Sequence, residues 1–250
     1  MVNTRVSPMD IIMVTQLDHA MLICKWVMDY FSLISFDLEG VKLGREGEIT
    51  LLQLGVNKHT VFCFDILALG NTVFLDEYLG KIFKSENICK LCYDCRMDAD
   101  VLKSKYNVTL KNIYDIQVLY TFVFQKDKDP FLKGLHHALQ SPGILNQKVA
   151  KKVIENKKCF KEALQSQGTE IFLQRPLPEH VLSYCASDVV HLFKMFYTWG
   201  SLIDFKVVVQ ATMYRLHRFC HRKFHIPAKK MSCIDFKQMP SELSTMVLTF

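Results

Sequence analysis

Three β-rich runs follow one another closely in the first third of the chain. They are LISFDLEG (33–40), EITLLQLGV (48–56) and HTVFCFDIL (59–67), and short turns containing Gly, Asn and Lys separate them. Strands joined so tightly pair as antiparallel neighbours, because a parallel pair needs a longer crossover connection. The sequence therefore predicts an antiparallel sheet at the centre of the fold.

The segments around these runs alternate between strand and helix. The pattern predicts strands at 11–15 and 88–93 and helices at 16–30, 72–84 and 98–106. A helix between two strands implies a crossover, so parallel pairs join the antiparallel ones. Beyond residue 114 the pattern is mostly helical. We expect an α/β fold with a mixed sheet flanked by helices.

The charge of the chain is concentrated toward its C-terminal end. The 250 residues carry a net charge of +6, and the segment 201–250 holds eight Lys and Arg against three acids, which is +5. We expect a body at 1–200 followed by a basic helical extension at 201–250. Such an extension suits a polyanion, with RNA or DNA the first expectation, although a solvated helix without a ligand is the alternative. The residues expected to bind nucleic acid are Arg215, Arg218, Arg222 and Lys223.

Composition and the first residues indicate the compartment. No apolar run reaches the roughly 18 residues that a membrane span needs, and the N-terminal stretch has no small-residue cleavage site. The nine cysteines lack the short, loop-rich setting of a disulfide framework, so we expect reduced and mostly buried thiols. These features favour a cytoplasmic protein with no membrane partner. They leave the oligomeric state open, a homodimer included.

Four carboxylates and one phenol stand out on three well separated elements. Asp37 and Glu39 are two apart on a predicted strand, so they share one face of the sheet. Tyr184 and Asp188 are four apart on a predicted helix and share its face. Asp98 begins a helix directly after a strand. An oxygen-only set of this kind suits Mg²⁺ or Mn²⁺.

Sulfur ligands are the competing interpretation. Cys89, Cys92 and Cys95 are spaced like thiolate ligands, but the first two point to opposite faces of a strand and the third falls in the following turn. We therefore expect that the three do not converge on a metal. HRFCHRKFH (217–225) contains further ligand types, and its spacing favours a basic helix over a zinc site.

The acid motifs resemble a known family. Asp37-x-Glu39, Asp98 and Tyr184-x-x-x-Asp188 resemble, in order and spacing, the three motifs of the DEDD superfamily of 3'-5' exonucleases, in the tyrosine-containing branch typified by ribonuclease D. The runs FDLEGVKLGREGEITLLQLG and KLCYDCRMDADVL are similar to the subgroup of Egalitarian and the exonuclease 3'-5' domain-containing protein of the piRNA pathway. The resemblance covers about residues 11–199 and implies a ribonuclease-H-like mixed sheet.

The resemblance also implies a catalytic mechanism. Asp37, Glu39, Asp98 and Asp188 would be the ligands of two Mg²⁺ or Mn²⁺ ions, and Tyr184 would place the attacking water. The product would be 5'-mononucleotides, released from the 3' end of single-stranded RNA. Proteins of a small-RNA pathway would be the expected partners.

Two positions depart from the pattern of the active enzymes. Tyr93 stands where relatives often have His, and Gly40 stands where many active exonucleases have a larger residue that wedges the terminal base. The subgroup implies RNA-binding adaptors with little or no nuclease activity. We therefore expect an RNA adaptor in a piRNA or small-RNA processing complex, and the alternative is an active two-metal 3'-5' exoribonuclease.

Overall fold

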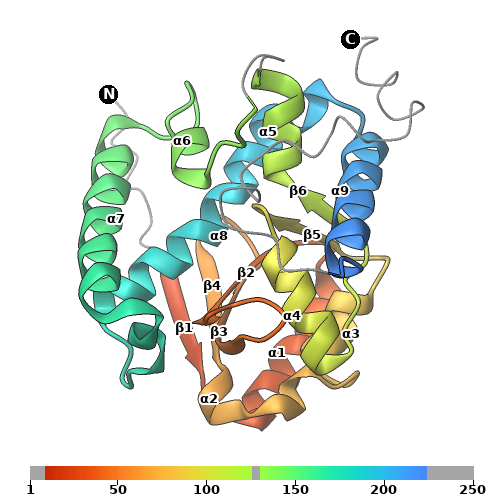
Figure 1. Cartoon of the computed structure of the whole chain (residues 1–250), viewed down its shortest axis with the longest axis vertical. Helices are drawn as coiled ribbons and strands as arrows, with labels where there is room; N and C mark the ends of the chain where they lie inside the picture. Colours follow the sequence, from red (N-terminus) through yellow and green to blue (C-terminus); the bar gives the residue numbers. More distant parts are fainter. Residues whose placement is uncertain (1–8, 126–129, 224–250) are drawn as a thin grey trace.

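The computed structural model describes residues 9–125 and 130–223, and in this part of the chain one mixed sheet of six strands forms the centre of the molecule (Figure 1). Its spatial order is β1-β4-β3-β2-β5-β6. The pairs β2–β3 and β3–β4 are antiparallel, and the pairs β1–β4, β2–β5 and β5–β6 are parallel. The strands are β1 Asp10–Val14, β2 Leu33–Val41, β3 Glu48–Gly55, β4 Thr60–Asp65, β5 Cys89–Cys92 and β6 Ile113–Asp115. The α/β fold and the mixed sheet predicted from the sequence are confirmed.

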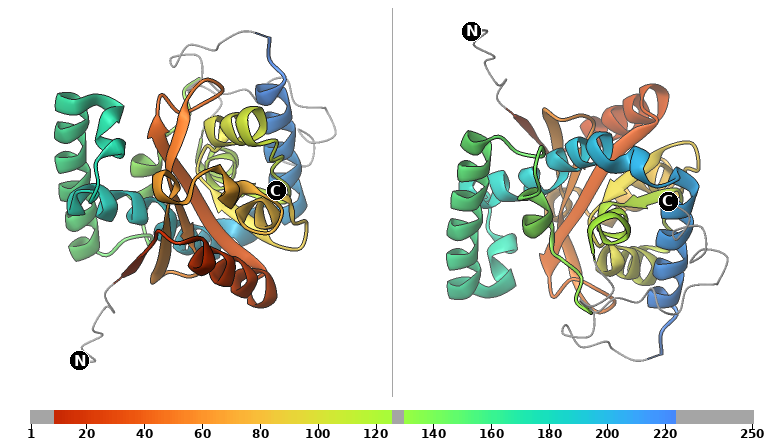
Figure 2. Two further views of the ribbon diagram at one scale, coloured as in Figure 1. Left: turned by 90° about the horizontal axis from the view of Figure 1, so that it is seen from below. Right: turned by 90° about the horizontal axis from the view of Figure 1, so that it is seen from above.

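Helices cover both faces of this sheet. The α-helices are α1 Leu17–Tyr30, α2 Ile66–Leu69, α3 Leu79–Lys84, α4 Arg96–Tyr106, α5 Ile116–Phe124, α6 Leu135–Leu139, α7 Gln147–Gln167, α8 Glu179–Trp199 and α9 Phe205–Cys220. Short 3-10 helices lie between them, at η1 Asn71–Phe74, η2 Gly168–Leu173 and η3 Gly200–Leu202. Figure 2 shows the sheet between α7 on one side and α4 and α9 on the other. In the described part of the chain, no helix has both the length and the apolar character of a membrane span.

Strand β2 presents different chemistry to the two faces of the sheet. Ile34, Phe36 and Leu38 point into a core built with α1, α3 and α4. The intervening residues Asp37 and Glu39 therefore point to the opposite face, which α8 covers. Because β2 lies between β3 and β5, the two acids sit on a central strand, as the sequence predicted.

A β-bulge follows Glu39. The register between β2 and β3 shifts between Glu39 and Gly40. A Cβ atom on Gly40 would clash with the carbonyl oxygen of Glu48 on the partner strand, so only glycine permits this close approach. The bulge ends the apolar–acidic alternation directly after the second acid. The absence of a side chain at Gly40 is therefore a requirement of the backbone.

Two elements of the structure differ from the sequence prediction. The helix expected at 72–84 is broken into η1 and α3, and the strand β6 was not expected. The proposed boundary after residue 200 is not a boundary in packing, because Val207, Val208 and Ala211 of α9 share a core with α5 and α8. Residues 224–250, the rest of the expected basic extension, lie outside the described residues.

Candidate carboxylate site

The sheet and two helices bring the predicted acids to one place beneath α8. The backbone N–H of Leu38 on β2 donates a hydrogen bond of 3.1 Å to the carboxylate of Asp98 at the start of α4. From the other side, the thiol of Cys185 on α8 contacts the Glu39 carboxylate at 3.9 Å. These contacts link α4 and α8 directly to the acid-bearing segment of β2.

Charge repulsion shows that the acids face one another. Burial raises the pKa of Asp37 well above its usual range, and the charges of Asp98, Glu39 and Asp188 raise it further. Burial likewise raises the pKa of Glu39, with contributions from Asp188 and Asp98. The pKa values of Asp98 and Asp188 rise to about 7, again mainly through burial. Four carboxyl groups with raised pKa values in one place require a cation when they ionise.

The phenol of Tyr184 is held against this cluster by two interactions. Its ring stacks on Phe160 of α7, with centroids 3.9 Å apart and an interplanar angle of 6°. Its hydroxyl donates a hydrogen bond to the carboxylate of Asp188, one turn along the same helix. Burial raises the pKa of Tyr184, so the hydroxyl keeps its proton. The structure thus brings together all five residues that the sequence predicted for the site.

The surroundings of Asp37 fit a divalent cation. Gln53 lies opposite Asp37 in the β2–β3 register, and its side chain therefore shares the acid-bearing face. Both polar atoms of the Gln53 amide are buried without a hydrogen-bond partner among the residues that the structure describes. A cation with its water ligands would offer that amide a partner and neutralise the acids. Sequence reasoning missed Gln53, since only strand register places it beside Asp37.

The acids nevertheless stand apart from one another. Within residues 9–125 and 130–223, the ligand atoms that lie within 4.8 Å of one another as a group of three belong to Cys92, Cys95 and Asp115, not to the four acids. Cation binding would have to draw the carboxylates closer.

The cysteine triplet behaves partly as predicted. Cys89 and Cys92 lie in different core clusters, on opposite faces of β5. Cys95, however, places its sulfur 2.9 Å from that of Cys92, so two of the three converge. Burial raises the pKa of Cys95 to about 11, and the neighbouring Asp115 carboxylate already accepts hydrogen bonds from two backbone N–H groups. Protonated thiols beside an occupied carboxylate are poor metal ligands.

Tyr93 lies away from the acid cluster. Its hydroxyl donates a 2.8 Å hydrogen bond to the carbonyl of Lys133, in the segment before α6. Burial raises its pKa, and the charged groups that act on the phenol are Asp115, Asp94 and Arg215. Tyr93 therefore fastens the chain that leads into α6.

Arg215, expected to contact nucleic acid, is an internal residue. Its side chain is 2% exposed and lies 3.3 Å from the carboxylate of Asp115. A second nitrogen of the guanidinium donates to the side-chain oxygen of Gln117 at 2.9 Å. This ion pair ties α9 to the end of β6. The expectation that Arg215 reaches RNA conflicts with this burial.

The other three basic residues of the predicted interface differ in exposure. Arg222 donates to the buried carboxylate of Asp100 at 2.9 Å, and its guanidinium lies 3.5 Å from the ring centroid of Phe219. Arg218 and Lys223 are exposed. The exposed surface of α9 and the residues just after it thus offers an anion two of the four predicted cations.

The histidine-rich stretch at 217–225 is helical up to Cys220, where α9 ends. His217 and His221 have ring centroids 4.1 Å apart. Nε2 of His221 lies 2.8 Å from the Nζ of Lys103, so a lysine faces this ring where a metal would have to bind. The last two residues of the stretch, 224 and 225, lie outside the described residues.

Sequence comparison identifies relatives of this chain. Residues 11–200 match the family model described as 3'-5' exonuclease. The chain is 31% identical over 164 residues to the piRNA biogenesis protein EXD1 of Mus musculus, covering 66% of this chain and 28% of that protein. It is 29% identical over 177 residues to the Danio rerio protein of the same name, covering 70% and 46%. It is 35% identical over 92 residues to the Egalitarian protein homolog of Caenorhabditis elegans, covering 36% and 16%. The chain spans less than half the length of these relatives.

Solved structures with the same fold include ribonucleases. The Trypanosoma brucei RNase D complex with GMP superposes with a TM-score of 0.76 at 22% identity, covering 95% of this chain and 72% of that chain. The complex of the same enzyme with RNA U12 gives a TM-score of 0.73 at 21% identity, covering 95% and 79%. Escherichia coli RNase D gives 0.60 at 20% identity, covering 88% and 52%. Fold, acid geometry and family match agree: the chain belongs to the 3'-5' exonuclease domain family and has the fold of RNase D.

Proposed function

We propose that the protein binds single-stranded RNA and that its carboxylate site, loaded with Mg²⁺ or Mn²⁺, removes nucleotides from the 3' end. The observation that carries this proposal is the convergence of four acids and one phenol from β2, α4 and α8, where desolvation raises the pKa of every acid and repulsion among the acids further raises the pKa values of Asp37 and Glu39. Such clusters of perturbed acids are typical of functional sites.

The structure gives a local reason for each of the two departures from the pattern of active enzymes. Gly40 is required by the β2–β3 bulge, because a Cβ would clash with Glu48. Tyr93 hydrogen-bonds the backbone before α6 and is acted on by charges outside the acid cluster. Neither position removes a chemical group from the carboxylate site. The balance therefore moves from the adaptor toward the enzyme.

The residues of the chain have distinct roles in this proposal. Asp37, Glu39, Asp98 and Asp188 would hold the cations, which would activate a water and stabilise the charge of the leaving oxygen. The neutral hydroxyl of Tyr184 would orient that water, since Phe160 fixes the ring beside Asp188. Burial under α8 limits the access of bulk water, which strengthens these interactions.

An RNA adaptor is the second candidate. Relatives named piRNA biogenesis proteins favour this role. The chain would then supply RNA binding to a small-RNA processing complex, and the acids would take no part. Partner proteins, a homodimer and a cytoplasmic location remain predictions from the sequence.

A nuclease assay distinguishes the candidates. A 5'-labelled single-stranded RNA with a 3'-hydroxyl is incubated with Mg²⁺ or Mn²⁺ and either the wild-type protein or Asp37→Asn, and a parallel gel shift in EDTA measures binding. The enzyme predicts stepwise shortening by the wild type, none by the variant, and equal shifts in EDTA. A shifted RNA that stays intact with both proteins would support the adaptor, and the absence of any shift would refute both roles.

A further inference from the structure

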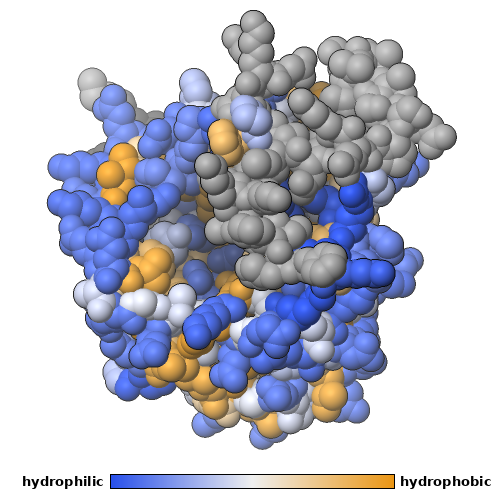
Figure 3. Space-filling model, in the orientation of Figure 1, coloured by the Kyte–Doolittle hydropathy of each residue, from blue (hydrophilic) through white to orange (hydrophobic). Residues whose placement is uncertain are grey.

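A hollow opens beside the carboxylate site, between α6, α7 and α8. It encloses about 120 Å³, and its polar lining includes His136 of α6, Asn156 and Lys157 of α7, and Tyr184 and Asp188 of α8. Figure 3 shows this side of the molecule, with mainly hydrophilic residues over α7 and a depression between α7 and the centre. The hollow thus extends the acid site toward α7.

Helix α7 carries lysines on two faces with different surroundings. On the outer face, Lys151 and Lys158 each lie 4.0 Å from a glutamate one turn along the helix, and their side chains are 80% and 78% exposed. On the inner face, Lys157 and Lys161 are four residues apart, and neither forms an ion pair with a carboxylate among the residues that the structure describes. Like charges at this spacing repel, so the inner face gains from a bound anion.

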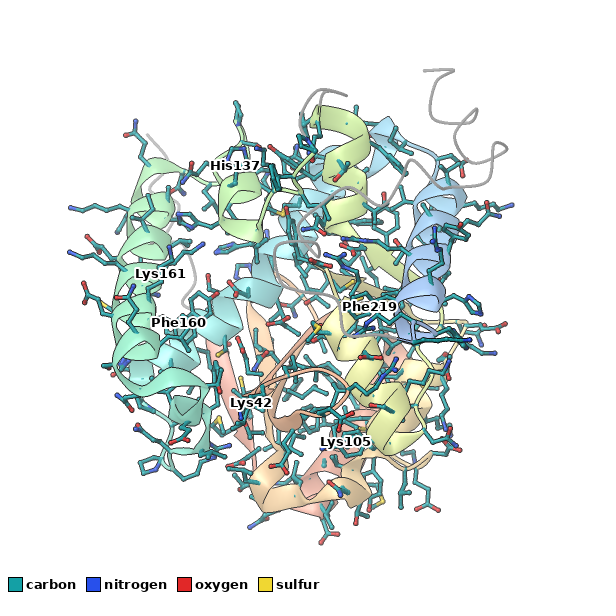
Figure 4. All side chains as sticks on the ribbon, in the orientation of Figure 1. Lys42, Lys105, His137, Phe160, Lys161 and Phe219 are labelled. Atoms are coloured by element: carbon teal, nitrogen blue, oxygen red, sulfur yellow. The ribbon has the colours of Figure 1, made fainter. Side chains whose placement is uncertain are left out.

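His136 of α6 adds an uncharged hydrogen-bonding group to this face. The pKa of His136 is lowered by burial and by the charges of Lys157, Lys161 and His137. The Nδ1 of His136 is buried without a hydrogen-bond partner among the described residues. Figure 4 shows Lys161 on α7 and His137 on the neighbouring helix α6. Two elements therefore place two ammonium groups and an imidazole nitrogen without a hydrogen-bond partner among the described residues beside one another.

Lys157 connects this surface to the acids. It lines the hollow together with Asp188, and each of the two charges favours the ionised form of the other. A phosphate arriving beside bare carboxylates would be repelled. The ammonium group of Lys157, at the boundary between the α7 surface and the acids, offsets that repulsion.

We propose that the inner face of α7, defined by Lys157 and Lys161 together with His136 of α6, is where the phosphate backbone of single-stranded RNA lies on its way to the carboxylate site. The inference rests on the proposed RNA binding and names the surface that performs it. It differs from the expectation that the basic C-terminal segment forms the path, since Arg215 of α9 and Arg222 just after α9 are engaged in ion pairs with buried carboxylates.

Salt-dependent binding of single-stranded RNA tests the proposal, with EDTA present so that no RNA is cleaved. Lys157→Gln/Lys161→Gln is compared with Lys151→Gln/Lys158→Gln, which removes the same charge from the outer face of the same helix. We expect the inner pair to weaken binding about tenfold and to reduce the slope of log K against log salt by about 1.4, because each single-strand phosphate contact contributes about 0.7. The outer pair should change affinity less than about twofold.

The outcomes separate this inference from the proposed function. Equal affinities and slopes for the inner and outer pairs, in a wild type that binds RNA, would overturn the α7 path alone. A wild type that binds no RNA would overturn both. Loss of the fold does not confuse the comparison, because replacing two lysines that repel each other should leave the melting temperature unchanged or raise it.

Cross-linking provides an independent readout. Wild-type protein is irradiated with single-stranded RNA that carries 4-thiouridine near its 3' end, and the attached peptides are identified by mass spectrometry. The proposal predicts attachment within residues 134–161, which include α6 and the inner face of α7. Attachment confined to α9, around Arg218 and Lys223, would overturn it.

Discussion

Replacing Asp188 with asparagine should stabilise the protein when no divalent cation is present. In the structure, burial removes water from the Asp188 carboxyl and disfavours its charged form, so its pKa rises from 3.8 to about 7. Asparagine has nearly the same shape and carries no charge. Its carbonyl oxygen can still accept the hydrogen bond from Tyr184. The substitution therefore removes an unfavourable buried charge with little loss of packing.

The size of the effect follows from the pKa. A rise of this extent means that ionising Asp188 at pH 8 costs the folded state about 4 kcal/mol, at 1.36 kcal/mol per pH unit. The pKa of about 7 already includes the attraction to Lys157, and the cost of removing the asparagine amide from water offsets part of this gain. We expect Asp188→Asn to raise the free energy of unfolding by about 2 to 4 kcal/mol at pH 8.

Urea unfolding at pH 8 in EDTA measures this difference. Asp76→Asn is the control, because Asp76 is 72% exposed and should change stability by less than about 0.5 kcal/mol. With Mn²⁺ in place of EDTA the order should reverse, since the wild type gains a ligand that the variant cannot hold as tightly. A variant that is less stable than the wild type in EDTA would show that ionising Asp188 in the folded state carries no such cost.

Three further predictions concern pH, ion pairing and the bulge. Because the pKa values of Asp98 and Asp188 are raised, the folded state keeps protons that the unfolded state has lost. In EDTA the free energy of unfolding should therefore fall between about pH 4 and pH 7 and then level off. Urea titrations at several pH values check this, and stability that rises over the interval would contradict it. Arg215→Met should cost about 3 to 5 kcal/mol of stability, because it leaves the Asp115 carboxylate buried and unpaired. The same substitution should leave the salt dependence of RNA binding unchanged, and a change in its slope would place Arg215 at the RNA. Gly40→Ala should cost at least about 2 kcal/mol, because the new methyl group meets the Glu48 carbonyl, and a neutral result in thermal unfolding would show that the bulge is dispensable.

Local patterns were sufficient to predict the candidate site. Asp37 and Glu39 alternate with apolar residues, and this period-two pattern alone fixes both acids on one face of β2. Tyr184 and Asp188 are one helical turn apart, which is a local property of α8. Their meeting with Asp98 was inferred from the order of motifs, and the hydrogen bond from Leu38 to Asp98 is the contact that realises it.

Long-range partners account for what the sequence did not reveal. β6 has three residues, too few for a periodic pattern, and exists because it pairs with β5. Arg215 looks like part of a basic surface helix until Asp115 and Gln117, about 100 positions away, are seen beside it. The constraint on Gly40 likewise comes from the facing strand. The distribution of Lys and Arg along the sequence favoured α9 as the RNA path, whereas the ion pairs in the structure favour α7.

Binding of Mn²⁺ is the most direct test of the carboxylate site. Electron paramagnetic resonance follows the loss of the free Mn²⁺ signal as wild-type protein, Asp37→Asn and the surface control Asp76→Asn are titrated at pH 8. The four converging acids predict that the wild type and the control remove Mn²⁺ from solution equally and that Asp37→Asn binds it at least about tenfold more weakly. Equal binding by all three proteins, or none by the wild type, would contradict the assignment of these acids as a metal site.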